Sequence, residues 1–125
     1  METGLPVKFD SAGIPFTLGA EGERSLLLLI REALQNAVRH AAPKNLRVAL
    51  SFDRHTLNVE VEDDGRGFDT SVVTSPNSSH SSHYGLVGMR ERAKELGGTF
   101  DLDSSPGRGT LMRLRIPAST AKPVI

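Results

Sequence analysis

The sequence contains no cysteine and no tryptophan, and it has a single tyrosine among its 125 residues. Without cysteine the chain has no disulfide framework and no thiolate metal site, and nothing indicates an oxidising compartment. Lys plus Arg equals Asp plus Glu at 15 each, so the zero net charge gives no reason to expect direct contact with nucleic acid or a membrane. No apolar run approaches the roughly 18 residues of a spanning helix, and no signal-peptide pattern opens the chain. We expect one cytoplasmic domain with an aliphatic core, monomeric when isolated.

An acidic residue followed by two closely spaced glycines stands at the end of a strand-like run. Residues 57–61 alternate apolar and polar side chains, and Asp63, Gly65 and Gly67 follow them. A buried carboxylate at a strand end can accept a hydrogen bond from an exocyclic amine. The two glycines let the backbone approach a flat ring closely and take conformations closed to other residues. The same letters also make an ordinary turn after a strand. The motif therefore indicates a site only together with the segments that surround it.

A row of polar residues runs along the helix predicted over residues 26–42. Apolar residues recur there at three- and four-residue steps, and Ser25 is expected to cap the start of the helix. Glu32, Asn36 and His40 are four residues apart and share one side of the helix. A solvated helix face would have the same spacing. The mixture of carboxylate, amide and imidazole nevertheless suits an Mg-bound phosphate group, with the amide oxygen on the metal.

A second helix is predicted between two pairs of glycines. Gly85 and Gly88 stand at its opening, and Gly97 and Gly98 supply a left-handed stop. Bare amide groups at a helix N-terminus favour phosphate, because the helix dipole attracts negative charge there.

The remaining apolar alternation predicts strands. Residues 46–61 form one hairpin, residues 100–116 form a second hairpin around a glycine turn, and residues 7–9 add a short edge strand. With two helices, this inventory predicts an α+β two-layer sandwich, in which helices cover one face of a mixed, mostly antiparallel sheet.

These four segments, in this order, resemble the nucleotide-binding domain of two-component sensor histidine kinases, a fold shared with type II topoisomerase, heat-shock-protein-90 and mismatch-repair ATPases. The helix that carries Asn36 resembles the asparagine box of the family. The segments that begin at Asp63, Gly85 and Gly107 resemble its three glycine boxes. The resemblance implies a catalytic domain over residues 1–117.

The run Gly-Met-Arg-Glu-Arg-Ala at residues 88–93 is similar to the subgroup that partners DNA-binding regulators of the nitrate-response and LuxR type. The overall sequence also resembles sensor kinases of the hypoxic dormancy regulon, which carry haem-binding GAF domains. Residues 118–125 are expected to form a disordered tail.

The resemblance implies binding of Mg-ATP and transfer of its γ-phosphoryl group to a histidine. It implies that Asp63 pairs with the adenine amine, that Gly65 and Gly67 make room for the ring, and that Thr110 supports the ring from beneath. It assigns Mg²⁺ to Asn36 and the orientation of water or the acceptor to Glu32. The residues expected at the ribose and phosphates are His40, Gly85, Leu86 and Gly88.

The resemblance also implies that half of the reaction lies elsewhere. No segment looks like the dimerising helix pair with its acceptor histidine, so the expected partners are a histidine-bearing dimerisation domain of the same kinase and a DNA-binding response regulator. Two alternatives stay open. One is a stand-alone serine kinase of the anti-sigma-factor type, and the other is a non-catalytic nucleotide-binding or docking module.

Residues 69–84 are expected to be the lid over the phosphates, because they are rich in serine and poor in core-forming residues. Tyr84 stands where the subgroup carries a more flexible approach to the second glycine box. We expect Tyr84 to anchor the lid inward, with its phenol hydrogen-bonded to Glu32 or Asn36, and so to lower the apparent affinity for nucleotide. The alternative is that Tyr84 anchors the second helix to the core. His80 and His83 are a poor match to a zinc site, since no cysteine or acidic cluster accompanies them.

Overall fold

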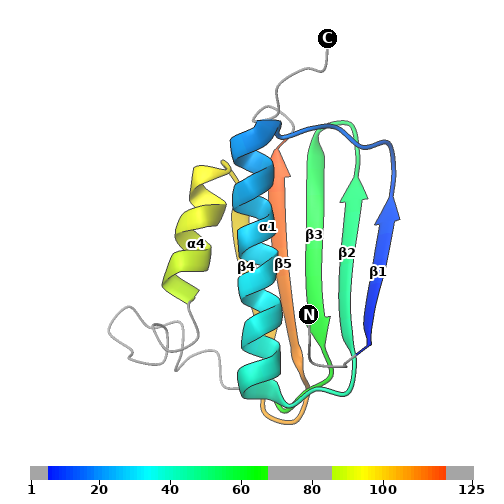
Figure 1. Ribbon diagram of the computed structural model, residues 1–125, viewed down its shortest axis with the longest axis vertical. Coiled ribbons are helices and arrows are strands. Elements are labelled where there is room, and N and C mark those ends of the chain that lie inside the picture. The colour runs from blue at the N-terminus through cyan, green and yellow to red at the C-terminus, as the bar shows by residue number, and fades with distance from the viewer. Residues whose placement is uncertain (1–5, 68–85, 118–125) are drawn as a thin grey trace.

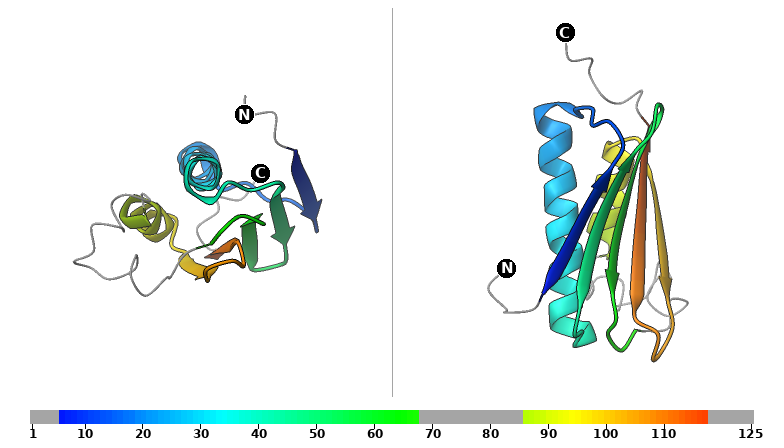
Figure 2. Two further views of the ribbon diagram at one scale, coloured as in Figure 1. Left: turned by 90° about the horizontal axis from the view of Figure 1, so that it is seen from below. Right: turned by 90° about the vertical axis from the view of Figure 1, so that its right-hand side faces the viewer.

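The computed structural model describes residues 6–67 and 86–117, without the side chains of residues 40, 41, 86 and 87. One five-stranded sheet has the order β1-β2-β3-β5-β4, and two helices cover one of its faces (Figures 1 and 2). The elements are β1 (Val7–Ala12), α1 (Gly19–Asn36), η1 (Ala37–Ala41), β2 (Leu46–Phe52), β3 (Thr56–Asp63), α4 (Leu86–Glu95), β4 (Thr99–Ser104) and β5 (Thr110–Pro117). The parallel pair β1–β2 is joined to three antiparallel pairings, which confirms the predicted two-layer sandwich.

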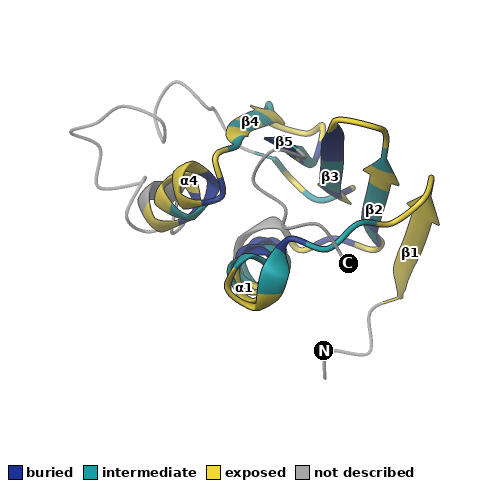
Figure 3. Cartoon of the chain, turned by 90° about the horizontal axis from the view of Figure 1, so that it is seen from above, coloured by how far each residue is buried: buried dark blue, intermediate teal, exposed yellow. Residues whose placement is uncertain are grey.

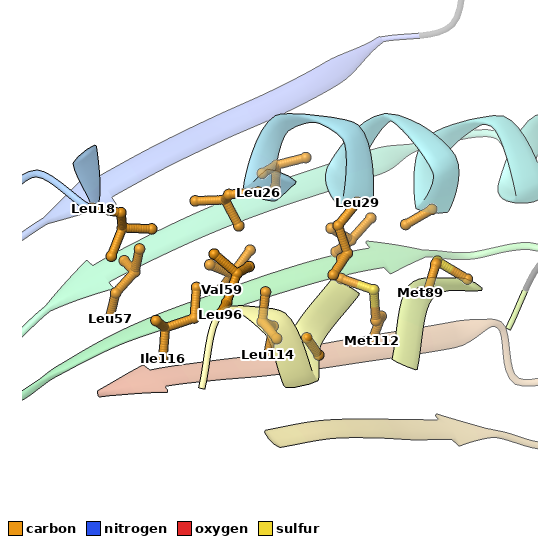
Figure 4. Close-up of a cluster of buried hydrophobic side chains, with 14 residues drawn as sticks. Leu18, Leu26, Leu29, Leu57, Val59, Met89, Leu96, Met112, Leu114 and Ile116 are labelled. Atoms are coloured by element: carbon orange, nitrogen blue, oxygen red, sulfur yellow. The ribbon is translucent and has the colours of Figure 1, made fainter. Parts of the chain in front are cut away.

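The core lies between the helices and the face of the sheet that they cover. Strand alternation puts Leu57, Val59 and Val61 of β3 on this face, in register with Ile116, Leu114 and Met112 of β5. Leu29 of α1 is fully buried against these strands, as Figure 4 shows. The other members of the cluster are Leu18, Leu26, Ala33, Val48, Met89, Ala93 and Leu96.

The opposite face of the sheet carries charged residues paired across strands. Arg47 of β2 donates to Glu62 at 2.9 Å and to Glu60 at 3.0 Å, both on β3. Arg113 of β5 lies 3.5 Å from the other oxygen of Glu60. One apolar and one polar face are typical of antiparallel sheets with water on one side. At the sheet edge, Phe9 of β1 is 61% exposed because the helices do not reach that strand (Figure 3).

The first helix begins earlier than its apolar pattern predicted. It starts at Gly19, so the assignment of Ser25 as its cap is wrong. The Thr17 hydroxyl accepts the Gly19 N–H at 3.0 Å and donates to the Glu23 carboxylate at 2.7 Å. Gly19 and Gly22 are poor helix formers, and this local fixation together with burial of Leu18 offsets their cost.

The end of the second helix agrees with its prediction. Gly97 has φ +72°, its N–H donates to the Lys94 carbonyl at 2.9 Å, and the Gly98 N–H donates to the Ala93 carbonyl at 2.9 Å. These two bonds form a Schellman motif. Within the described residues, no helix is long and apolar enough to cross a bilayer.

Two leucines of α1 test where the stability resides. We expect Leu29→Ala to lower the free energy of unfolding by about 2–5 kcal/mol, because it leaves a cavity at a fully buried position. Leu27→Ala, at a position that is 67% exposed on the same helix, should change it by less than about 0.5 kcal/mol. Urea denaturation of both variants measures the difference. Equal losses would contradict the assigned core.

Candidate nucleotide site

The predicted site segments gather at one end of the sandwich, the lower end in Figure 1. Asn36 is the last residue of α1, Asp63 is the last residue of β3, and Thr110 is the first residue of β5. Helix α4 packs beside α1 on the same face of the sheet. The fold therefore brings the asparagine-box helix close to the first and third glycine boxes, which are distant in the sequence.

Asp63 ends the row of β3 side chains that faces the helices. It is 8% exposed, and it pairs in register with Leu46 on one side and Thr110 on the other. One carboxylate oxygen, Oδ1, accepts the Gly65 N–H at 2.8 Å. A carboxylate has about four acceptor sites, so Asp63 keeps capacity to accept a further donor beside its backbone donors.

The environment of Asp63 makes its charge costly. Burial raises the pKa of the Asp63 carboxyl above its ordinary value, and the Gly65 N–H opposes this rise by donating to the charged form. The neighbouring charges of Asp64 and Glu62 raise the pKa further, and the Thr110 backbone lowers it. A ligand that donates a hydrogen bond to this carboxylate would stabilise its charged form.

The turns of the first and third glycine boxes pack against each other. The Gly107 N–H donates to the Arg66 carbonyl at 2.6 Å. Gly67 has φ +65°, and a Cβ there would lie 2.1 Å from the Ser105 carbonyl oxygen. Gly109 has φ +74°, and its Cβ would lie 2.3 Å from the Asp63 carbonyl oxygen. Glycine is required at both positions by backbone conformation and by close approach.

Gly65 does not share this requirement, because its φ is not positive. The expectation that both glycines of the first box adopt conformations closed to other residues is therefore correct for Gly67 and wrong for Gly65. The observed contribution of Gly65 is the N–H that anchors Asp63.

Thr110 contacts Ser104 of the neighbouring strand β4. The Ser104 hydroxyl donates to the Gly109 carbonyl at 2.8 Å and lies 2.9 Å from the Thr110 hydroxyl. Because Ser104 has one hydroxyl hydrogen, Thr110 is the donor in the second bond. The Thr110 oxygen thus keeps its remaining lone-pair capacity beside Asp63, which suits its predicted place under a ring.

The asparagine-box row is only partly regular. Glu32 and Asn36 are both half-buried and one turn apart on α1. The next residues, Ala37–Ala41, form a π-helical turn, so the expectation of a continuous α-helical row to His40 is wrong. A π-turn adds a residue to the turn and shifts every position after it, and such turns are frequent at functional sites. The His40 side chain lies outside the described structure.

The second glycine box opens α4. Gly88 is the third residue of the helix, so its N–H belongs to the turn that has no partners within the helix. It is exposed, and a Cβ at this position would meet nothing within 4 Å. Leu86 begins the helix. The predicted residues Gly85 and Tyr84, and the predicted lid at residues 69–84, lie outside the described residues.

A carboxylate that the sequence interpretation did not single out links two parts of the site. Asp64 Oδ1 accepts the Lys44 N–H at 2.8 Å and the Asn45 N–H at 2.9 Å, and Oδ2 accepts the Asn45 side-chain amide at 3.0 Å. The bonds from the Asn45 backbone and side chain hold the pKa of the Asp64 carboxyl below its ordinary value. The available signal was the position of Asp64 just past the strand, where the alternation points it outward and where aspartates bind backbone N–H groups.

Hollows in the described part of the chain lie both near Asp63 and away from it. One of about 520 Å³ borders Asp63 and Asp64 and is lined also by Asn45, Arg47 and Arg108. Another, of about 640 Å³, lies between the start of α1 and the end of α4 and contains none of the predicted site residues. The larger hollow is therefore not the predicted site.

A mixed five-stranded sheet covered on one face by helices is the fold that this chain shares with ATP-binding domains of histidine kinases. The histidine kinase domain of the blue-light activated histidine kinase from Erythrobacter litoralis superposes with a TM-score of 0.69 at 26% identity, over 90% of this chain and 55% of that one. The ATP-binding domain of PrrB from Mycobacterium tuberculosis shares the fold, with a TM-score of 0.65 at 23% identity over 90% and 79% of the two chains.

Residues 21–120 match the family described as histidine kinase-, DNA gyrase B-, and HSP90-like ATPases, and the chain belongs to this family. An uncharacterised sensor-like histidine kinase of Chloroflexus aurantiacus is 36% identical over 101 residues, which are 80% of this chain and 17% of that protein. Sensor histidine kinase LiaS of Bacillus subtilis is 31% identical over 113 residues, 90% of this chain and 29% of LiaS. The chain thus spans less than a third of the length of these curated relatives.

The adjacent carboxyls Asp63 and Asp64 should affect stability with opposite dependence on pH. Between the ordinary value of 3.8 and its raised pKa, Asp63 binds more protons in the folded state, so its contribution to stability falls as the pH rises. Asp64, whose pKa is lowered, contributes stability above 3.8 that is lost as the pH falls through its folded pKa.

Urea denaturation of the wild type, Asp63→Asn and Asp64→Asn over a series of pH values measures both effects. The free energy of unfolding of the wild type minus that of Asp63→Asn should fall with rising pH, and the corresponding difference for Asp64→Asn should rise. A rising difference for Asp63 would show that its hydrogen bonds outweigh its burial.

Proposed function

We propose that this chain is the catalytic domain of a sensor histidine kinase, which binds Mg-ATP and donates the γ-phosphoryl group to a histidine on a separate dimerisation domain. The observation that carries the proposal is the buried Asp63 carboxylate at the end of β3, which accepts the Gly65 N–H and lies between two glycine turns. This carboxylate would accept a hydrogen bond from the exocyclic amine of adenine. The packed turns at Gly67 and Gly109 would leave the ring close to the backbone.

Phosphate recognition would fall to residues on the two helices. The first-turn N–H groups of α4, including those of Leu86 and Gly88, would donate to phosphate oxygens, and the bare surface at Gly88 would let them approach. His40, Gly85 and a lid over residues 69–84 anchored by Tyr84 complete the proposed set. Thr110 would support the ring through its hydroxyl oxygen.

The residues present fit magnesium carried by the nucleotide. Within the described residues, no group of three or more His, Asp or Glu side chains is placed to hold a metal by itself. Mg²⁺ in nucleotide sites is held by one or two protein oxygens together with substrate phosphates, and Asn36 would supply such an oxygen from the end of α1. When bound, Mg²⁺ neutralises charge on the phosphates. Glu32, one turn before Asn36, would orient the acceptor.

The relatives favour this function over the two alternatives. Those named above are sensor histidine kinases, which argues for a histidine acceptor and against a stand-alone serine kinase or a docking module. The Gly-Met-Arg-Glu-Arg-Ala run at residues 88–93 supports the subgroup whose partners are DNA-binding response regulators. A reaction that consumes ATP would take place in the cytoplasm.

Adenine recognition by Asp63 is tested by calorimetry with ADP. We expect Asp63→Asn to weaken binding by about 1–3 kcal/mol, because an amide presents a donor where the adenine amine needs an acceptor. Asp53→Asn is the control, since Asp53 accepts backbone N–H groups in the β2–β3 turn at the far end of the sheet. Equal affinities of wild type and Asp63→Asn would remove the basis for this pocket.

Substitutions in the asparagine box should affect nucleotide binding and phosphoryl transfer to different extents. In the full-length kinase, Asn36→Ala and Glu32→Ala should reduce phosphoryl transfer far more than they reduce ADP affinity, because metal and acceptor handling act at the γ-phosphate. Radiolabel transfer from γ-labelled ATP and ADP titration measure the two effects. Transfer by both variants at the wild-type rate would refute the asparagine-box assignment.

A further inference from the structure

The exit of the asparagine-box helix is held in a strained conformation. After η1, Ala42 adopts left-handed backbone angles, φ 48° and ψ 53°, and it is the only non-glycine residue of the described structure with a positive φ. Such a residue costs free energy and persists only where its surroundings over-determine it. The next residue, Pro43, is buried, and the two after it, Lys44 and Asn45, are exposed.

The Asp64 carboxylate is the side chain that fixes this exit. Its Oδ1 accepts the N–H groups of Lys44 and Asn45, and its Oδ2 accepts the Asn45 side-chain amide. The Asp64 N–H in turn donates to the Asn45 carbonyl at 3.4 Å. Four hydrogen bonds therefore join the segment after η1 to the start of the Asp63–Gly67 loop.

This connection lies between the two halves of the proposed nucleotide site. Asp63, the proposed adenine ligand, is the preceding residue on the same backbone and points to the opposite side of it. Asn36, the proposed metal ligand, lies just before η1. The relative position of the two depends on how the end of η1 is fixed against the end of β3.

We propose that Asp64 is a positioning residue of the nucleotide site, which holds the asparagine-box helix in register with the adenine-binding loop. This inference rests on the proposed function. A ligand that reaches both halves, such as ADP with Mg²⁺, needs that register. Adenosine contacts the adenine half and needs it much less.

The test compares ADP with adenosine on the 125-residue chain. Calorimetry measures the affinity for Mg-ADP, and ligand-observed NMR measures the affinity for adenosine. The affinity for Mg-ADP divided by the affinity for adenosine reports the contribution of the phosphate half of the site. We expect Asp64→Ala to lower this ratio about fivefold or more, the usual size of a coupling between two parts of a protein. Loss of a negative charge alone would favour ADP, so the expected change opposes the simple electrostatic effect.

Asp53→Ala is the matched control. Asp53 Oδ1 accepts the N–H groups of His55 at 2.8 Å and Thr56 at 2.7 Å, so its loss removes the same kind of turn-fixing carboxylate far from the site. It should lower the melting temperature comparably and leave the ratio unchanged. Asp64→Asn, which keeps an acceptor oxygen for the two backbone N–H groups, should restore most of the ratio.

Asn45→Ala removes only the side-chain bond and should give a smaller change in the same direction, which supplies the measurement if Asp64→Ala does not fold. An unchanged ratio in both Asp64→Ala and Asn45→Ala would overturn the proposal, as would an equal loss of ADP and adenosine. Failure of the wild type to bind ADP would instead overturn the proposed function, and this inference with it.

Discussion

The site depends on a carboxylate that occupies the last place of a hydrophobic row. Leu57, Val59 and Val61 face the helices, and the same two-residue period puts Asp63 on that face at the strand end. Burial there opposes ionisation, and the Gly65 N–H compensates only in part, because the pKa remains raised. The fold thus keeps a buried acceptor at the edge of its core, and protein donors offset the cost of its charge only in part. A ligand that donates a hydrogen bond to this acceptor would offset the rest.

Asp63 and Asp64 are neighbours with opposite tasks because a strand alternates its side chains. One points into the layer between sheet and helices, and the other points outward to the segment that leaves η1. The inward carboxylate is buried and has a raised pKa, whereas the outward one has a lowered pKa and accepts three hydrogen bonds from Lys44 and Asn45. The proposed roles of the two identical side chains, recognition for Asp63 and positioning for Asp64, thus follow from their different environments.

Periodicity explains which parts of the fold were predictable. Both hairpins, the edge strand and the stop at Gly97 follow from alternation and turn chemistry, and the structure has them. The start of α1 was missed because residues 19–25 carry no apolar stripe, and the bonds that Thr17 makes to Gly19 and Glu23 are not encoded in any periodic pattern. The π-turn after Asn36 was missed because it occupies only the last five residues of the helical segment, too few to show a change in the phase of the apolar stripe. The asparagine-box and glycine-box residues were identifiable from the order of their motifs, but the link made by Asp64 depends on pairing across 19 residues of sequence.

The glycines of the site motifs have different physical reasons for being glycine. Gly67 and Gly109 have positive φ, and a Cβ at either would collide with backbone of the facing turn, so they are needed to build the loops whether or not nucleotide is present. Gly88 has open space around its Cβ position and an ordinary φ, so the fold does not require it. In the proposed site, the close approach of a phosphate would require glycine at this position. Loss of binding after substitution at Gly67 or Gly109 therefore reports first on the architecture of the loops, whereas the same loss at Gly88 reports on the ligand.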